Sequence, residues 1–307
     1  MTTSGSRKPT CVPGLFLRPI RWPEEAQLID DVSNERRRAG GGLFGMNVEV
    51  VRDLSDHLVN SRLADDFSAA EAKALGVNLT IALPQEEVDL EKQVAMIDAA
   101  IEKKVSAIII SASSSDGVIP EIQKARAAGI KIINFDTRIS DKTLVDAYVG
   151  ANDEAGAYKA GKYICKKLNG QGEVGLLEGL LAQSTGVDRK AGFERAIAEC
   201  PGIKIVARTG AEWRSDIALN ATQNMLTANT NIKALFASID QMAVSMVARV
   251  KAGGKNPKNA LPAGYTSTLA ARTALLTGTP PPFAPPPPRS IAARCSRPAT
   301  PTPQTTP

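Results

Sequence analysis

The chain has 307 residues, 43% of them hydrophobic and 22% charged, which is enough for two globular domains that each bury a core and argues against a disordered chain. Aromatic residues make up only 4%, a composition that suits helices and buried parallel strands better than an all-β sandwich. The net charge of +5 does not indicate nucleic-acid binding, because the arginine surplus lies partly at the two ends while acids and bases are interspersed between them.

The first segment, residues 1–52, is predicted to be an irregular head. Pro9, Pro13 and Pro19 interrupt its apolar stretches, so no secretory signal sequence is apparent. No run in the whole chain reaches the ~18 apolar residues that a membrane span requires. We therefore expect no stable membrane insertion.

After the head, short apolar runs alternate with helical patterns. Leu90, Val94, Ile97 and Ile101 recur every three or four residues, which predicts a helix that lies on a sheet. Gly129 is a predicted C-cap of the next helix. The runs predicted to be strands are residues 77–82, 107–111, 131–136, 147–151, 173–179, 203–209 and 233–238.

This alternation predicts an α/β fold with parallel, doubly wound sheets. The pattern restarts near Gly150, so we expect an N-terminal lobe over residues 53–150 and a C-terminal lobe over residues 151–255. Residues 256–307 form a proline-rich tail, with the run "GTPPPFAPPPP", that is predicted to be disordered. Both ends of the fold are thus expected to be irregular.

Four polar or aromatic residues follow predicted strands, at the sheet edge where ligands bind in open parallel α/β folds. They are Asp136, Arg189, Trp213 and Asp240. The carboxylates can accept hydrogen bonds from adjacent hydroxyls, and a guanidinium can donate several in one plane. An indole can stack on the C–H face of a ring. This set predicts a small polyhydroxylated ligand.

Each of these residues also has a structural alternative. Asp136 could be a helix N-cap. Arg189 could pair with Asp188 or Glu194 on an exposed helix, and Trp213 could be ordinary core. These alternatives stay open at the level of sequence.

The residues for metal binding and nucleophilic catalysis are sparse. His57 is the only histidine and falls near the head, so a Ser/His/Asp or Cys/His scheme lacks a base in the regular region. The four cysteines have no CxxC spacing, so we expect no zinc site. The spacing predicts isolated thiols without a disulfide framework. We expect no metal, no cofactor and no enzymatic activity.

The order of motifs in the regular region resembles the type I periplasmic sugar-binding proteins of the ribose-binding group. The motifs include "VDLEKQVAMIDAAIEKKVSAIIIS", "IPEIQKARAAGIKIINFDTRI", "YVGANDEAGAYKAGKYICKKL", "STGVDRKAGFERAI", "AEWRSDIALNATQNML" and "ALFASIDQMA". Within that group the sequence is most similar to proteins that bind inositols and their derivatives, including rhizopine. The likeness covers about residues 67–255.

The resemblance implies two Rossmann-like lobes joined by a hinge that close on a sugar or cyclitol, a periplasmic location, and an ABC permease as partner. By position it implies that Asp136, Arg189 and Trp213 contact the ligand, with Arg138 near a further family arginine. Asp240 is retained, but Ile239 stands where the family usually has a ligand-binding asparagine.

Two other functions are compatible with the same lobes. A LacI-type transcriptional regulator shares this sensor, yet the head shows no pair of short helices that would form a helix-turn-helix. An enzyme could use Asp136 and Asp240 as acid and base. We favour the solute-binding component of an ABC transporter.

Overall fold

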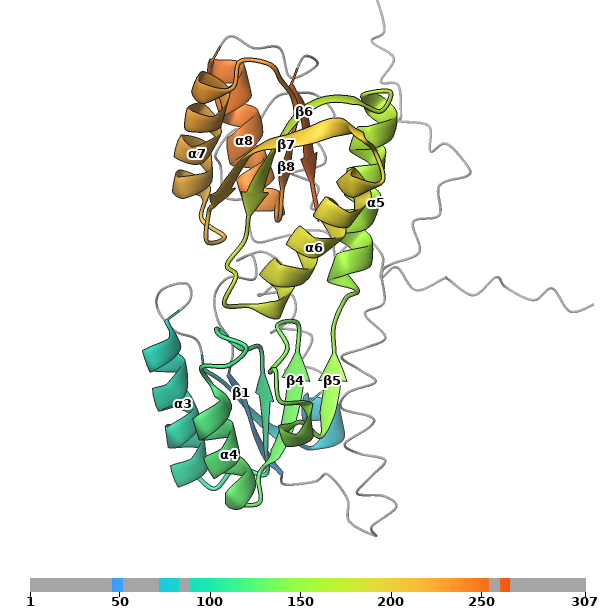
Figure 1. The fold of residues 1–307 in the computed structure, drawn as a ribbon. Helices are drawn as coiled ribbons and strands as arrows, with labels where there is room; N and C mark the ends of the chain where they lie inside the picture. The colour runs from blue at the N-terminus through green and yellow to red at the C-terminus, as the bar shows by residue number, and fades with distance from the viewer. Residues whose placement is uncertain (1–45, 52–71, 83–88, 254–259, 266–307) are drawn as a thin grey trace, which may run out of the picture.

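The computed structural model describes residues 46–51, 72–82, 89–253 and 260–265, which form two α/β lobes, each built on a parallel sheet (Figure 1). The chain passes from the first lobe to the second through residues 150–152. The α/β class with parallel sheets predicted from the alternating pattern is confirmed.

The N-terminal lobe has a sheet in the order β2-β1-β3-β4-β5. All four neighbouring pairs are parallel. The strands are β1 (Asn47–Val51), β2 (Asn78–Ala82), β3 (Ala107–Ile110), β4 (Lys131–Phe135) and β5 (Ala147–Val149). Strands β2 to β5 coincide with predicted apolar runs.

The inner strands β1, β3 and β4 are largely buried on both faces of the sheet, which is why β3 has a continuous apolar sequence. Helices α3 (Leu90–Glu102) and α4 (Ile119–Ala127) cover one face and pack on Ile108 and Ile110. Ala107 and Ile133 point to the opposite face, toward Leu75 of a helical turn at residues 72–75. Gly129 has a φ of +81° directly after α4, as expected of a C-terminal cap.

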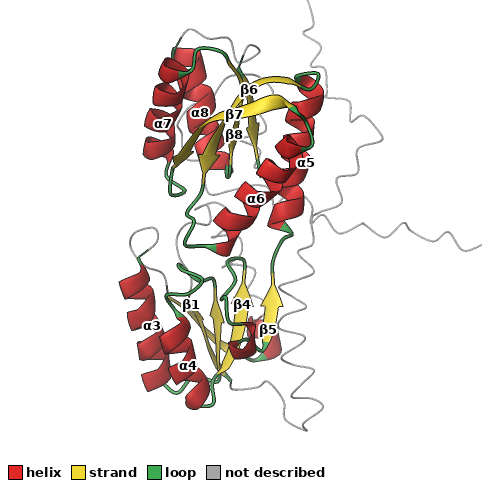
Figure 2. Cartoon of the chain, in the orientation of Figure 1, coloured by secondary structure: helices red, strands yellow, loops and turns green. Residues whose placement is uncertain are grey.

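The C-terminal lobe has a sheet in the order β7-β6-β8-β9, again with parallel neighbours. Helices α5 and α6 cover one face, and α7 and α8 cover the other (Figure 2). The elements are α5 (Asp153–Lys167), β6 (Gln171–Glu178), α6 (Ser184–Ala198), β7 (Gly202–Gly210), α7 (Ser215–Ala228), β8 (Ile232–Ala237), α8 (Asp240–Ala252) and β9 (Leu261–Gly264).

Two strands lie in segments that the sequence analysis assigned to the irregular ends. β1 belongs to the predicted head, yet it pairs with both β2 and β3 near the centre of its sheet. The sequence did not predict this strand because Glu49 interrupts its apolar run. The Glu49 carboxylate is buried and pairs with Lys103, whose Nζ lies 3.0 Å from Oε1. β9 belongs to the predicted tail and contains Pro262, which an edge strand tolerates.

A disulfide joins the C-terminal ends of α5 and α6. Cys165 and Cys200 are 35 residues apart in sequence, and their Cα atoms lie 6.3 Å apart. The expectation of isolated thiols is therefore wrong for this pair. The spacing gave no sign of it because the two cysteines meet only when α5 and α6 pack side by side on the sheet.

We expect reduction of this disulfide to lower the free energy of unfolding by about 2–4 kcal/mol, because the bond constrains a long loop in the unfolded chain. Urea unfolding with and without dithiothreitol measures the difference. A Cys165→Ser/Cys200→Ser variant is the control, since its unfolding curve should not respond to reductant. Identical wild-type curves in both conditions would contradict a stabilising bond.

Candidate functional site

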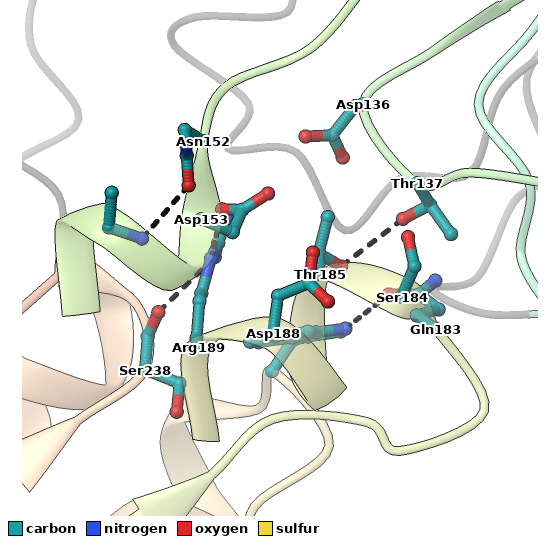
Figure 3. Close-up of polar contacts among 12 residues, drawn as sticks. Asp136, Thr137, Asn152, Asp153, Gln183, Ser184, Thr185, Asp188, Arg189 and Ser238 are labelled. Atoms are coloured by element: carbon teal, nitrogen blue, oxygen red, sulfur yellow. Dashed lines mark hydrogen bonds and ion pairs between the residues drawn. The ribbon is translucent and has the colours of Figure 1, made fainter. Parts of the chain in front are cut away.

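The carboxyl ends of the two sheets face each other across the junction of the lobes. In Figure 1, β4 and β5 point upward from the first lobe, and β6 points downward from the second. Side chains at these strand ends therefore meet at one place. Figure 3 shows that Asp136 of the first lobe lies opposite Asp153, Arg189 and Ser238 of the second.

Arg189 is the centre of this constellation. It projects from α6, is 8% exposed, and its Nε donates to Oδ1 of Asp153 at 2.7 Å. Its Nη1 donates to the carbonyl oxygen of Ser238 at 3.2 Å. The guanidinium carbon also lies 4.2 Å from the ring centre of Tyr265 and 5.4 Å from that of Trp213. A buried cation is thus fixed in position by several contacts.

The charge of Arg189 is retained despite its burial. Burial by itself lowers the pKa of this guanidinium, but the nearby carboxylates of Asp153 and Asp136 outweigh that effect and place the pKa above its usual value. The alternative of an exposed pair with Asp188 or Glu194 is wrong. Asp188 pairs with Arg138, and Glu194 accepts from Arg208.

Two residues of this cluster were missed by the sequence analysis. Asp153 is the first residue of α5 and is 1% exposed. In sequence it is merely an acidic residue at a helix start. Tyr265 follows β9, in the segment predicted to be disordered, and burial followed by the charge of Asp153 raises the pKa of its hydroxyl. The phenol therefore stays protonated at neutral pH.

Trp213 is both core and polar contact. It is 3% exposed and packs in the hydrophobic cluster between the sheet and α7 and α8. Its indole Nε1 nevertheless donates to Oε1 of Gln183 at 2.6 Å. The ring is thus part of the core, as the structural alternative predicted, and contact of its face with a ligand stays a prediction.

The backbone is strained at the same place. Asp136, Glu212 and Trp213 have φ values of +53°, +49° and +63°, in the left-handed region that favours glycine. Each such residue costs roughly 1–3 kcal/mol, and such strain concentrates at functional sites. The strained residues flank the Arg189 cluster from both lobes.

Asp136 directly follows β4, as predicted, and does not cap a helix. The next helical turn, η1 (Lys142–Leu144), has Asp141 as its N-cap. The N-cap alternative for Asp136 is therefore wrong. Its backbone oxygen accepts from the Tyr148 hydroxyl at 2.8 Å, and its carboxylate is close enough to Arg189 to raise the pKa of that residue.

Asp240 is the first residue of α8 and is buried, where the helix dipole favours a carboxylate. Ile239 before it is 3% exposed and packs in the core. An isoleucine side chain neither donates nor accepts hydrogen bonds. Position 239 therefore cannot make the side-chain hydrogen bonds to a ligand that the asparagine implied by the resemblance would make.

Arg138 lies at the contact between the lobes. Its Nη2 donates to Oδ2 of Asp188 on α6 at 2.6 Å, and its backbone N–H donates to Oγ of Ser184 at 2.8 Å. Burial lowers the pKa of its guanidinium, but the hydrogen bond and charge of Asp188 raise it above the usual value. Arg138 and Asp188 also line an open polar pocket of about 390 Å³, together with residues 150–154.

Further contacts between the lobes come from the first turn of α6 and the residues just before it. The carbonyl oxygen of Ala182 accepts from the N–H of Ser115 at 2.9 Å, and the N–H of Ser184 donates to Oγ of Ser115 at 3.0 Å. The hydroxyls of Thr137 and Thr185 are 3.2 Å apart. Hydrogen bonds of this kind are specific in geometry and easily exchanged with water, as a separable interface requires.

Polar side chains of both lobes thus converge at the carboxyl ends of two parallel sheets, the edge at which open α/β folds bind ligands. The model of the periplasmic binding protein domain matches residues 60–296. The chain belongs to this periplasmic binding protein family.

Individual relatives agree with this family. The chain is 31% identical over 176 residues to the D-ribose/D-allose-binding protein of Pseudomonas aeruginosa, covering 56% of this chain and 55% of the relative. It is 31% identical to the D-allose-binding periplasmic protein of Escherichia coli, over 61% of this chain and 63% of the relative. The chain thus matches less than two thirds of the length of each of these two relatives.

A solved structure gives the same picture. An ABC transporter periplasmic solute-binding protein of Actinobacillus succinogenes, determined with bound D-allose, superposes with a TM-score of 0.67 at 33% identity. The match covers 76% of this chain and 82% of that one. None of the helices in the described ranges is long and apolar enough to cross a membrane.

Proposed function

We propose that this protein binds a sugar or a related polyol between its lobes and presents it to an ABC permease. The observation that carries the proposal is the buried guanidinium of Arg189, held by Asp153 and placed opposite Asp136 of the other lobe. Such a group donates hydrogen bonds to adjacent hydroxyls in one plane, and the facing carboxylate accepts from them. The Trp213 indole beside it supplies an apolar surface for C–H groups.

The relatives support a transport role over a regulatory or enzymatic one. They are named as binding proteins for ribose, allose or apiose, and the apiose proteins are named for import. The Cys165–Cys200 disulfide supports a periplasmic location, because such bonds persist in oxidising compartments.

We infer an aldose such as ribose or allose as the first candidate ligand. The ligand names of the relatives support this choice. An inositol derivative such as rhizopine is the second candidate, and it rests on the sequence resemblance. The same hydrogen-bonding groups can bind the hydroxyls of either candidate, so measured affinities are needed to decide between an aldose and an inositol derivative.

A thermal-shift panel tests the proposal. Ribose, allose, apiose, galactose, xylose, myo-inositol and inosamines are added singly to the purified chain. A ligand at 100 times its Kd should stabilise the protein by about 2.7 kcal/mol. We expect the largest shift with ribose or allose, and recovery of the ligand unchanged after incubation.

The panel has clear opposing outcomes. A cooperatively unfolding protein whose Tm no member raises would overturn the sugar-binding proposal. Conversion of a panel member to a product would replace it with an enzymatic function. A shift with inositols alone would move the ligand class from aldoses to cyclitols.

A further inference from the structure

We propose that Gln183 is a positioning residue that links the orientation of Trp213 to closure of the two lobes. The inference rests on the proposed function, because it gives closure the task of fixing the aromatic surface that a sugar would contact. It concerns a residue that touches both lobes.

The side chain of Gln183 spans the lobe junction. It is 1% exposed and lies at the N-cap position of α6, yet it makes no capping hydrogen bond. Its Oε1 accepts from Nε1 of Trp213 at 2.6 Å, within the C-terminal lobe. Its Nε2 donates to the carbonyl oxygen of Ser113 at 3.3 Å, in the N-terminal lobe.

The chemistry of these partners fixes the direction of the amide. An indole N–H only donates and a backbone carbonyl only accepts, so the amide oxygen must face Trp213 and the nitrogen must face Ser113. A glutamine supplies an acceptor and a donor on one rigid group. Neither a carboxylate nor a thioether of similar length supplies both.

The two hydrogen bonds of Gln183, to Trp213 and to Ser113, form a bridge between the lobes. In the N-terminal lobe, Ser113 is itself held in place by hydrogen bonds. Oε1 of Gln93, a buried residue of α3, accepts from both the N–H and the hydroxyl of Ser113, each at 2.8 Å. Its Nε2 donates to the carbonyl oxygen of Ser111, also at 2.8 Å. These bonds fix the segment from Ser111 to Ser113, which follows β3, against α3. The carbonyl of Ser113 can therefore accept from Gln183 only when the two lobes are at a particular separation.

In the C-terminal lobe, the backbone that carries Trp213 is strained. Trp213 and Glu212 both have positive φ, and the indole N–H is buried, so loss of its acceptor leaves an unsatisfied donor. Opening the lobes breaks the bond to Ser113 while the bond to Trp213 can persist. Closure then restricts the Gln183 amide, and through it the tryptophan ring.

Two substitutions separate the two halves of the bridge. Gln183→Glu keeps an acceptor for Trp213, but an ionised carboxylate repels the carbonyl of Ser113. Gln183→Met removes both bonds. Gln223→Glu is the matched control, because Gln223 is exposed on α7 and bonds only locally, to Thr227.

The experiment uses the full chain with Trp22→Phe, so that Trp213 is the single tryptophan. At pH 8 we expect Gln183→Glu to weaken sugar affinity about tenfold through faster dissociation. Its lobes should open, so small-angle scattering should show a larger radius of gyration. The ligand-free Trp213 emission should shift as well, because open lobes no longer restrict the side chain at position 183. Gln183→Met should also shift the Trp213 emission.

The ligand-free measurements keep this test separate from the proposed function. If wild type binds no sugar but Gln183→Glu still opens the lobes and shifts the Trp213 emission, the link is supported and the sugar-binding proposal is wrong. An open Gln183→Glu variant with unchanged emission would show that the ring is not linked to closure. If both variants match Gln223→Glu in scattering and emission, the link is wrong, whatever the ligand.

Discussion

Replacing Arg189 with methionine is expected to weaken sugar binding about 10- to 100-fold and to lower the free energy of unfolding by about 3–5 kcal/mol. The binding loss follows from removal of the planar donor that faces Asp136. The stability loss follows because Asp153, which is 1% exposed, loses the cationic partner 2.7 Å away. Calorimetric titration with the panel ligand and urea unfolding measure the two effects.

A second variant separates these effects. Adding Asp153→Asn to Arg189→Met removes the uncompensated charge, so it should recover much of the stability and none of the affinity. Arg208→Met is the matched control, because Arg208 forms an exposed pair with Glu194 and should change stability by less than about 0.5 kcal/mol. Wild-type affinity in the Arg189→Met variant would remove Arg189 from the proposed site.

Replacing Trp213 with alanine is expected to have an effect of similar size. The change removes a nearly fully buried indole from the core cluster and should cost about 3–5 kcal/mol of stability. It also removes the apolar surface beside Arg189, so sugar affinity should fall about tenfold. Chemical unfolding and titration report the two losses, and a variant with wild-type affinity would show that the ring serves packing alone.

The Trp213 ring packs on Gly179, so its position can be changed without removing it. A methyl group at Gly179 would meet ring atoms of Trp213 at 1.9 Å, so Gly179→Ala must displace the indole. Gly210→Ala is the matched control, since nothing lies within 4 Å of the added methyl. Weaker sugar binding in Gly179→Ala alone would attribute the effect to the position of the ring.

Much of the fold could be predicted from local sequence. The apolar run at residues 107–111 became β3, and the stripe from Leu90 to Ile101 became α3. These predictions succeeded because strands buried on both faces and helices on a sheet have distinct periodicities. β1 was not predicted because Glu49 breaks its apolar run. The cation that pairs with this buried carboxylate is Lys103, 54 residues away in the chain.

The candidate site was predictable in part. The positions of Asp136, Arg189 and Trp213 after strands, together with the family resemblance, singled them out, and the structure places all three around one lobe junction. Their contact with a ligand remains a prediction. Asp153 and Gln183 were not predicted, because a helix-start aspartate and a glutamine are ordinary residues until their partners are known.

The sequence by itself determined the class of fold, the two repeated α/β units and the residue types able to bind a polyol, because periodicity and residue chemistry are local properties. Tertiary structure alone decided that Cys165 meets Cys200, that Asp153 neutralises Arg189, and that Gln183 joins Trp213 to the opposite lobe. Each of these contacts joins residues distant in the chain. Only the packing of helices on sheets, and of one lobe against the other, brings such groups within bonding distance.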